Sequence, residues 1–106
     1  MSLMKINCVI LNYNDADTTG KLVRQIREYD SLNQIVVVDN ASTDGTADYL
    51  KTLDMPGLVC RNPGKNLGGA GGFAYGIREA AALGCKAVWI MDDDTLPTPT
   101  ALETLL

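Results

Sequence analysis

Three consecutive aspartates, Asp92, Asp93 and Asp94, directly follow the apolar run AVWIM at residues 87–91. An uninterrupted apolar run of this length is typical of a buried strand. Adjacent carboxylates repel one another unless a cation or a positive ligand group lies between them. Open α/β sheets bind their ligands outside the carboxyl ends of the strands. The aspartates are therefore a candidate metal site, and their oxygen atoms suit Mg²⁺ or Mn²⁺ better than zinc.

The aspartate run also has a plainer interpretation, as a solvated acidic turn that caps the next helix. A cap needs a single polar side chain, and three carboxylates exceed that requirement. We therefore favour the metal interpretation.

Two other expected strand ends carry polar residues. Tyr13, in the segment Leu11-Asn12-Tyr13-Asn14, is placed to stack on a base or sugar, although an ordinary half-buried tyrosine in a turn is the simpler interpretation of this residue alone. Asp39 ends the second strand, where an acidic residue commonly accepts a hydrogen bond from a ribose or base. Asp39 is equally compatible with a solvated position beside a helix capped by Ser42 or Asp44, and both interpretations stay open.

A glycine-rich segment, NPGKNLGGAGG at residues 62–72, follows the third expected strand. Residues 69–74 fit the pattern G-x-G-x-x-A, but that pattern marks a dinucleotide site only after a first strand. Glycine-dense backbone before a helix amino terminus suits an anion or a diphosphate, to which Lys65 would add a positive charge. A flexible loop that uses glycine for its turns explains the segment equally well.

The elements that position these residues alternate along the chain. Apolar runs predict strands at 5–11, 34–38, 58–61 and 86–91. Helical periodicity predicts helices at about 15–29, 42–53, 73–83 and 100–106. Strands that alternate with helices form parallel sheets through right-handed crossovers. We predict an α/β fold, a Rossmann-like three-layer α/β/α arrangement with a mostly parallel sheet, in one domain that covers residues 1–106.

Composition narrows the function classes. The chain has 106 residues, of which 46% are hydrophobic, enough for one small globular domain. Its net charge of −4, without a basic stripe, argues against a nucleic-acid partner. The absence of histidine excludes Ser-His-Asp triads and histidine-ligated metals.

Cysteine usage and hydropathy indicate the compartment. Cys8, Cys60 and Cys85 are far apart and have no metal-type spacing, so we interpret them as reduced core residues of a cytosolic protein. No apolar run reaches the length of a membrane span. We expect a cytoplasmic location, which includes the inner face of the membrane.

Together these segments resemble the nucleotide-sugar half of family 2 glycosyltransferases, which have the GT-A fold. The resemblance covers nearly the whole chain. Within the family, this chain most resembles the branch that contains galactofuranosyl- and rhamnosyltransferases, because it has the N-L-G-G-A-G-G-F loop and the triple aspartate. The matching segments are Leu11-Asn12-Tyr13-Asn14, residues 38–46 (VDNASTDGT), residues 66–73 (NLGGAGGF) and Met91-Asp92-Asp93-Asp94.

The resemblance implies a role for each segment. Tyr13 would pack on the nucleobase, usually uracil or thymine, and Asp39 would hydrogen-bond that base. Asp92 would approach the ribose or the metal, and Asp94 would ligate a divalent Mn or Mg ion that bridges the diphosphate. The nucleotide-sugar site implied in this way comprises Leu11, Asn12, Tyr13, Asp39, Asn40, Lys65, Asn66, Gly68, Gly69, Asp92 and Asp93, with Asp92 and Asp94 as metal ligands.

The implied activity is inverting transfer of a sugar from a UDP- or dTDP-linked donor to a glycan or lipid-linked acceptor. Inversion needs a base that deprotonates the acceptor hydroxyl. Members of the family continue past the aspartates into an acceptor-binding half that carries this base. We therefore expect the base beyond Leu106, assign no catalytic residue, and predict a truncated amino-terminal part that supplies donor binding only.

The expected last helix has an apolar side. The helix at 100–106 carries Leu102, Leu105 and Leu106, and an apolar edge of this kind favours a homo-oligomer.

A Mg²⁺-binding receiver-like or other regulatory α/β module is the alternative function. It would place its phospho-acceptor aspartate after the third strand, where this chain has Arg61-Asn62. A sugar-phosphate nucleotidyltransferase would have a basic glycine-rich loop after the first strand, and this chain does not.

Overall fold

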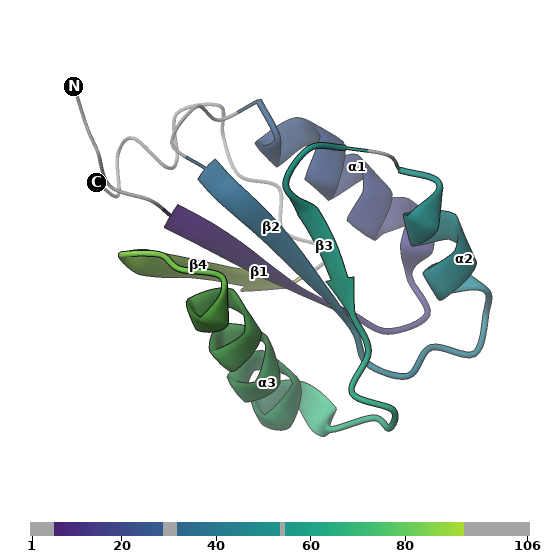
Figure 1. Ribbon diagram of the computed structural model, residues 1–106. Helices are drawn as coiled ribbons and strands as arrows, with labels where there is room; N and C mark the ends of the chain where they lie inside the picture. Colours follow the sequence, from purple (N-terminus) through teal and green to yellow (C-terminus); the bar gives the residue numbers. More distant parts are fainter. Residues whose placement is uncertain (1–5, 29–31, 54, 93–106) are drawn as a thin grey trace.

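The computed structural model describes residues 6–28, 32–53 and 55–92. Strands and helices alternate along these residues, as the sequence predicts (Figure 1). The elements are β1 (Ile6–Asn12), α1 (Ala16–Ile26), β2 (Leu32–Asp39), α2 (Thr46–Lys51), β3 (Leu58–Arg61), α3 (Gly68–Ala82) and β4 (Ala87–Asp92).

The four strands form one sheet in the order β3-β2-β1-β4. Every pairing in it is parallel, which confirms the predicted sheet type. Asn12 of β1 is level with Asp39 of β2, and Leu11 is level with Asp92 of β4. The carboxyl ends that carry the candidate site residues therefore meet along one edge of the sheet.

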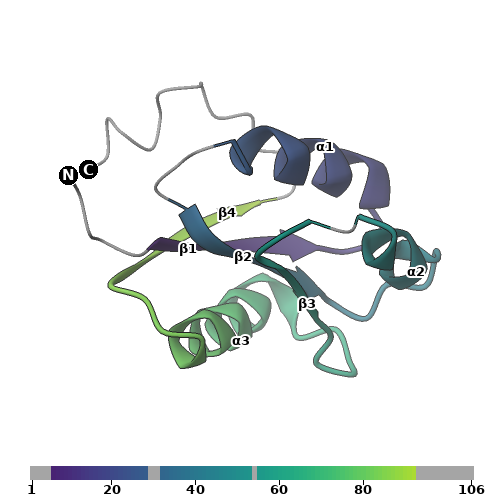
Figure 2. The ribbon, with the colours of Figure 1, turned by 45° about the horizontal axis from the view of Figure 1, so that its top comes forward.

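Helices cover both faces of the sheet, so the three-layer prediction is confirmed. Figure 2 shows α1 and α2 on one face and α3 on the other. Because side chains alternate along a strand, β1 sends Ile6, Cys8 and Ile10 to the α1 side. Val9 and Leu11 of the same strand pack on the α3 side.

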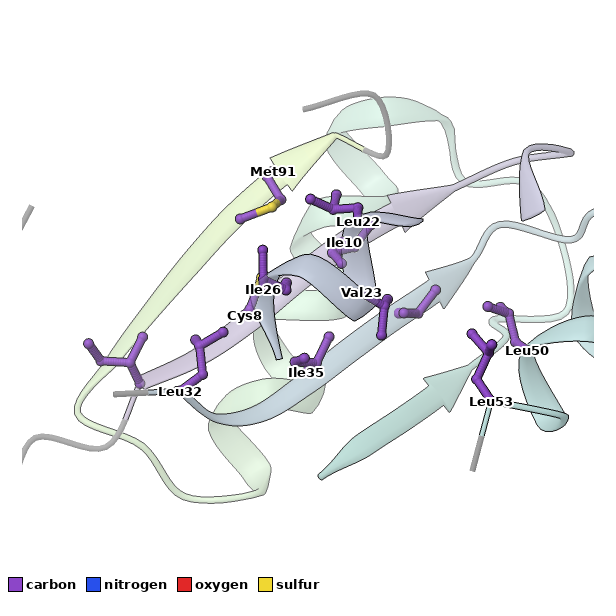
Figure 3. Packing of buried hydrophobic residues seen from close by; sticks show 12 residues of the cluster. Cys8, Ile10, Leu22, Val23, Ile26, Leu32, Ile35, Leu50, Leu53 and Met91 are labelled. Carbon is purple, nitrogen blue, oxygen red and sulfur yellow. The ribbon is translucent and has the colours of Figure 1, made fainter. Parts of the chain in front are cut away.

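The main core lies between the sheet and the helix pair α1 and α2 (Figure 3). Ile10, Ile26 and Ile35 are completely buried there. Burial of an aliphatic side chain of this size contributes about 1.5–3 kcal/mol. The apolar face of α1, with Leu22, Val23 and Ile26, is thus held to the strands that carry the site residues.

Helix α3 begins earlier than predicted. We expected its first turn at Phe73, after a glycine loop, but the helix starts at Gly68. Glycine disfavours helices in isolation, and here tertiary packing overrides that preference. A Cβ atom at Gly76 would lie 2.5 Å from Val9 Cγ1 and 2.8 Å from Val38 Cγ2, so glycine lets the helix lie close to the sheet.

The interpretation of all three cysteines as core residues was wrong for two of them. Cys8 is buried, whereas Cys60 on β3 is exposed and Cys85 is partly buried. Strand β3 is an edge strand with only four residues, so its side chains are less covered than those of β1.

The expected roles of Asp93 and Asp94 and the expected helix at 100–106 fall on residues outside the described ranges. Among the residues that the structure describes, no helix has the length and apolar character needed to cross a membrane.

Candidate functional site

A pocket of about 350 Å³ opens at the carboxyl edge of the sheet, on the α3 side. We call it the α3-side pocket. Its lining comes from the ends of β1, β2 and β4 and from the start of α3. The lining residues are Leu11, Tyr13, Asn40, Asn66, Gly68, Gly69 and Asp92. All seven belong to the predicted nucleotide-sugar site, so the structure brings together residues that are up to 81 positions apart, from Leu11 to Asp92.

Asn40 fixes the glycine-rich segment to the end of β2. Its Nδ2 donates to the carbonyl oxygen of Gly68 at 3.1 Å, and its Oδ1 accepts from the backbone N–H of Leu67 at 2.9 Å. Asn66 Oδ1 accepts from the backbone N–H of Gly68 at 2.8 Å, and Gly68 has a φ of 74°, a backbone conformation that favours glycine. The amino terminus of α3 is therefore held at the pocket, where its N–H groups favour anions.

Tyr13 is positioned for stacking. Its side chain is 48% exposed, an unusual degree for a large aromatic residue next to a buried strand. Gly69 has nothing within 4 Å of an added Cβ, so the rim of the pocket beside it is open. An exposed aromatic ring next to open glycine backbone provides a surface for a flat ring of a ligand.

Asp39, the last residue of β2, lies on the same face of the sheet as Val37, the face covered by α1 and α2, because residues two apart on a strand share a face. Only 3% of Asp39 is exposed. Its Oδ1 accepts a 3.0 Å hydrogen bond from the backbone N–H of Ser42. Its buried Oδ2 has no hydrogen-bond partner among the described residues. A buried carboxylate oxygen without a donor is costly, so Asp39 is poised to accept a hydrogen bond from a ligand.

Asp39 lines a second pocket, of about 270 Å³, which we call the α2-side pocket. Its other walls are α2 and the end of β3. The lining residues are Asp39, Ala47, Leu50, Lys51, Cys60, Arg61 and Asn62. The predicted site residues are thus divided between two pockets at the same edge of the sheet.

The side chain of Asn12 holds neighbouring elements together. It is fully buried, its Oδ1 accepts from the Thr19 hydroxyl at 2.7 Å, and its Nδ2 lies 3.3 Å from Ser42 Oγ. These contacts tie β1 to α1 and to the turn after β2. Neither Asn12 nor Lys65 lines either pocket, and Lys65 is exposed in the loop before α3.

The turn after β2 is strained at Ala41. Its φ of 62° is unfavourable for a residue with a Cβ atom. Ser42, the next residue, accepts from the backbone N–H of Asn14 at 2.9 Å and donates its own N–H to Asp39. The strained turn therefore joins the ends of β1 and β2 and orients the Asp39 carboxylate.

Asp92 is the member of the aspartate run that the structure describes. It is exposed and lines the α3-side pocket with a carboxylate, the type of ligand that Mg²⁺ and Mn²⁺ prefer. Within residues 6–28, 32–53 and 55–92, no group of three or more Asp, Glu, Cys or His side chains is arranged to hold a metal ion. Asp92 therefore fits as one oxygen ligand, and the other aspartates of the run lie beyond these residues.

Sequence reasoning missed part of the site. Ser42 was considered only as a helix cap, and the residues at the end of β3 were not assigned to the site. Ser42 follows Asp39 by three residues, a spacing at which a capping Asp side chain accepts from a backbone N–H. Cys60 gave no signal, because a lone cysteine in an apolar run reads as a core residue.

Comparison with known proteins decides the family. The family model described as Glycosyl transferase family 2 matches residues 8–106, which is most of the chain. The chain belongs to glycosyl transferase family 2. This family 2 domain is 38% identical over 92 residues to galactofuranosyltransferase GlfT1 of Mycolicibacterium smegmatis, covering 86% of the chain and 29% of the relative.

Two other proteins are similar to this family 2 chain. Galactofuranosyltransferase GlfT1 of Mycobacterium tuberculosis is 60% identical over 70 residues, covering 58% of the chain and 21% of the relative. Among solved structures, mannosyltransferase PcManGT from Pyrobaculum calidifontis, in complex with GDP-Man and Mn²⁺, superposes with a TM-score of 0.76 at 26% identity. That match covers 96% of this chain and 31% of the other.

The chain spans less than a third of the length of these three proteins. The GT-A similarity confirms the predicted fold class, and the family match favours a glycosyltransferase over a receiver-like module. Strand β3 ends at Arg61, whose Nε pairs with Glu79 Oε1 at 3.1 Å, so no phospho-acceptor aspartate lies at that position.

Proposed function

We propose that this chain supplies the donor-binding part of a glycosyltransferase that uses a UDP- or dTDP-linked sugar. The full protein would transfer the sugar, with inversion, to a glycan or lipid-linked acceptor on the cytoplasmic side of a membrane. The GlfT1 relatives are named galactofuranosyltransferases, which supports a sugar-transfer role. We assign this transfer to cell-wall or polysaccharide biosynthesis. In this proposal the α3-side pocket receives the ribose and diphosphate, and the α2-side pocket receives the base.

The observation that carries the proposal is the Oδ2 atom of Asp39, which has no hydrogen-bond partner within the described part of the chain. Because Ser42 already occupies Oδ1, Asp39 offers a ligand a single buried acceptor. The N3–H of uracil or thymine is a single donor between two carbonyl groups. Guanine presents N1–H and an amino group side by side, which pair best with both oxygens of a carboxylate. A single free oxygen therefore favours uracil or thymine.

The flanking carbonyl groups of such a base also need donors. Asn62 and Lys51 line the α2-side pocket together with Asp39, and their side chains carry an amide and an ammonium group that can donate. Adenine and cytosine would place a ring acceptor where Asp39 offers another acceptor. The donor set of the pocket thus complements the acceptor-donor-acceptor edge of uracil and thymine.

Asp92 would hold the divalent cation together with Asp94, and Mn²⁺ in the mannosyltransferase complex supports a cation of this type. When bound, the cation would neutralise the diphosphate. The amino terminus of α3 would add N–H donors and a partial positive charge on the same side of the ligand. Tyr13, which lines the α3-side pocket, would pack against the ribose.

Calorimetric titration with a panel of nucleoside diphosphates tests this function. We expect UDP and dTDP to bind more tightly with Mn²⁺ than without it, and more tightly than GDP, ADP or CDP. Free uridine separates the base contribution from that of the diphosphate. If neither UDP nor dTDP gains affinity from Mn²⁺ or Mg²⁺, the site assignment is wrong. If GDP binds best, the assignment of the base to Asp39 is wrong.

A further inference from the structure

The α2-side pocket contains a thiol that sugar transfer does not use. Cys60 lies on β3 opposite Val37 of β2, and Asp39 is two residues further along β2. Residues two apart on a strand point to the same face. Cys60 and Asp39 are therefore diagonal neighbours on the α2 side of the sheet, and both line the pocket.

A second observation marks this pocket as a ligand site. Asp39 is 97% buried, since only 3% of it is exposed, and its Oδ2 has no hydrogen-bond partner among the described residues. The exposed residue Cys60 thus lines a pocket of about 270 Å³ together with Asp39, the residue that would recognise the base.

We propose that Cys60 is a thiol-modification site, and that a small group attached to its sulfur excludes the nucleobase from the α2-side pocket. Donor binding would then be sensitive to low-molecular-weight disulfides and to soft electrophiles. The inference rests on the proposed function, because it assumes that the base occupies this pocket.

The modification step is thiol–disulfide exchange. The Cys60 thiol loses its proton to solvent, and the thiolate attacks one sulfur of a disulfide. The disulfide S–S bond breaks, a mixed S–S bond to Cys60 forms, and the other half leaves as a thiolate. The Cys60 sulfur is oxidised and the reagent disulfide is reduced, so a reducing thiol reverses the step.

The surroundings of Cys60 set the speed of this step. Partial burial raises the pKa of its thiol, the Asp39 carboxylate raises it further, and Arg61 lowers it. Little thiolate is present at neutral pH, so modification is slow there and faster in mildly alkaline solution.

The other two cysteines provide internal controls. Cys8 is completely buried. Cys85 lies just before β4, at the opposite end of the sheet from the pockets, with its Sγ 3.7 Å from the carbonyl oxygen of Ala80. Modification of Cys85 should leave nucleotide binding unchanged.

The experiment uses the aryl disulfide DTNB on the whole 106-residue chain, with peptide mass mapping and UDP calorimetry in Mn²⁺. We expect modification at Cys60 to weaken UDP binding at least tenfold, and a reducing thiol to restore it. Saturating UDP should slow the modification of Cys60 but not that of Cys85. In Cys85→Ser, DTNB treatment should still weaken UDP binding. In Cys60→Ser, UDP affinity should be the same before and after DTNB treatment.

Two results would overturn the inference and leave the proposed function intact. One is unchanged UDP affinity in protein that mass mapping shows to be modified at Cys60. The other is failure of DTNB to modify Cys60 at all while UDP binds. If the unmodified chain binds no nucleoside diphosphate, the proposed function fails, and the inference fails with it.

Discussion

Asp39 has two carboxylate oxygens in different surroundings, and this difference can be tested directly. In Asp39→Asn, the amide oxygen can still accept from the Ser42 N–H, so the turn is retained. The amide NH₂ group would then face the base N–H, donor against donor. We expect UDP affinity to fall by about 2 kcal/mol, roughly 30-fold. Calorimetry measures this loss.

Asp48→Asn is the matched control for that substitution. Asp48 is exposed in the first turn of α2 and lines neither the α2-side nor the α3-side pocket. The Asp48→Asn variant should bind UDP with the same affinity as the unsubstituted chain. Equal losses in both variants would indicate a general charge effect and would remove the case for Asp39 as the base acceptor.

Cys8 makes stability depend on pH in the alkaline range. Burial raises the pKa of its thiol to about 12, from an ordinary value of 9.0. Between these values the unfolded chain loses the proton and the folded chain keeps it, so stability falls as pH rises. The contribution of the protonated Cys8 thiol to the free energy of unfolding is complete below pH 9. Between pH 9 and about 12 it decreases by about 1.4 kcal/mol per pH unit. Urea unfolding at several pH values measures the slope.

Cys8→Ala separates this effect from other alkaline titrations. The variant loses packing and is less stable at every pH. Its free energy of unfolding should nevertheless fall less steeply above pH 9 than that of the unsubstituted chain. Identical slopes for the two proteins would contradict the assignment to Cys8.

Helix α3 depends on close approach to the sheet at Gly76. In Gly76→Ala, the new methyl group meets the side chains of Val9 and Val38, and β-branched residues have few alternative rotamers. We expect a loss of about 1–3 kcal/mol in the free energy of unfolding. Gly69→Ala is the control, because an added Cβ has nothing within 4 Å. That variant should be at least as stable as the original chain, since alanine favours helices.

Strand β1 depends on a buried asparagine near its amino end. Asn7 Nδ2 donates to the carbonyl oxygen of Ala80 at 2.8 Å, and its Oδ1 accepts from the backbone N–H of Gln34 at 3.1 Å. Asn7→Ala leaves both backbone groups without these partners and should cost about 3 kcal/mol. Asn33→Ala removes only the donor of a 3.2 Å bond to Asn7 Oδ1 and should cost about 1 kcal/mol. Denaturant midpoints distinguish the two variants.

Sequence reasoning succeeded for elements whose pattern is local. The apolar runs of β1, β2 and β4 and the polar residues at their ends were recognisable, and Leu11, Asn40 and Asp92 do meet at one pocket. It failed where distant residues decide the outcome. The start of α3 depends on Leu11 and Asn40, which lie against Gly72, and the exposure of Cys60 depends on β3 being an edge strand. Neither fact is encoded in the neighbouring residues.

Nucleotide binding should be visible in the stability of the whole molecule. A ligand that binds only the folded chain stabilises it by about 2.7 kcal/mol at 100 times its dissociation constant. For a domain of this size, that raises Tm by roughly 10 °C or more. We expect this shift with UDP and Mn²⁺, and a smaller one with CDP and Mn²⁺. A thermal melt followed by circular dichroism measures both.

The position of β1 has a consequence for synthesis of the chain. Strand β1 is internal in the sheet, yet one of its neighbours, β4, begins 75 residues after β1 ends, at Ala87 against Asn12. While the ribosome makes the intervening segment, β1 and β2 can pair, but the far side of β1 presents unpaired backbone groups. A nascent chain in this state is prone to association with its neighbours on the same messenger RNA. Slow translation through residues 68–92 would prolong that exposure, so the rate of elongation there should govern the yield of folded protein.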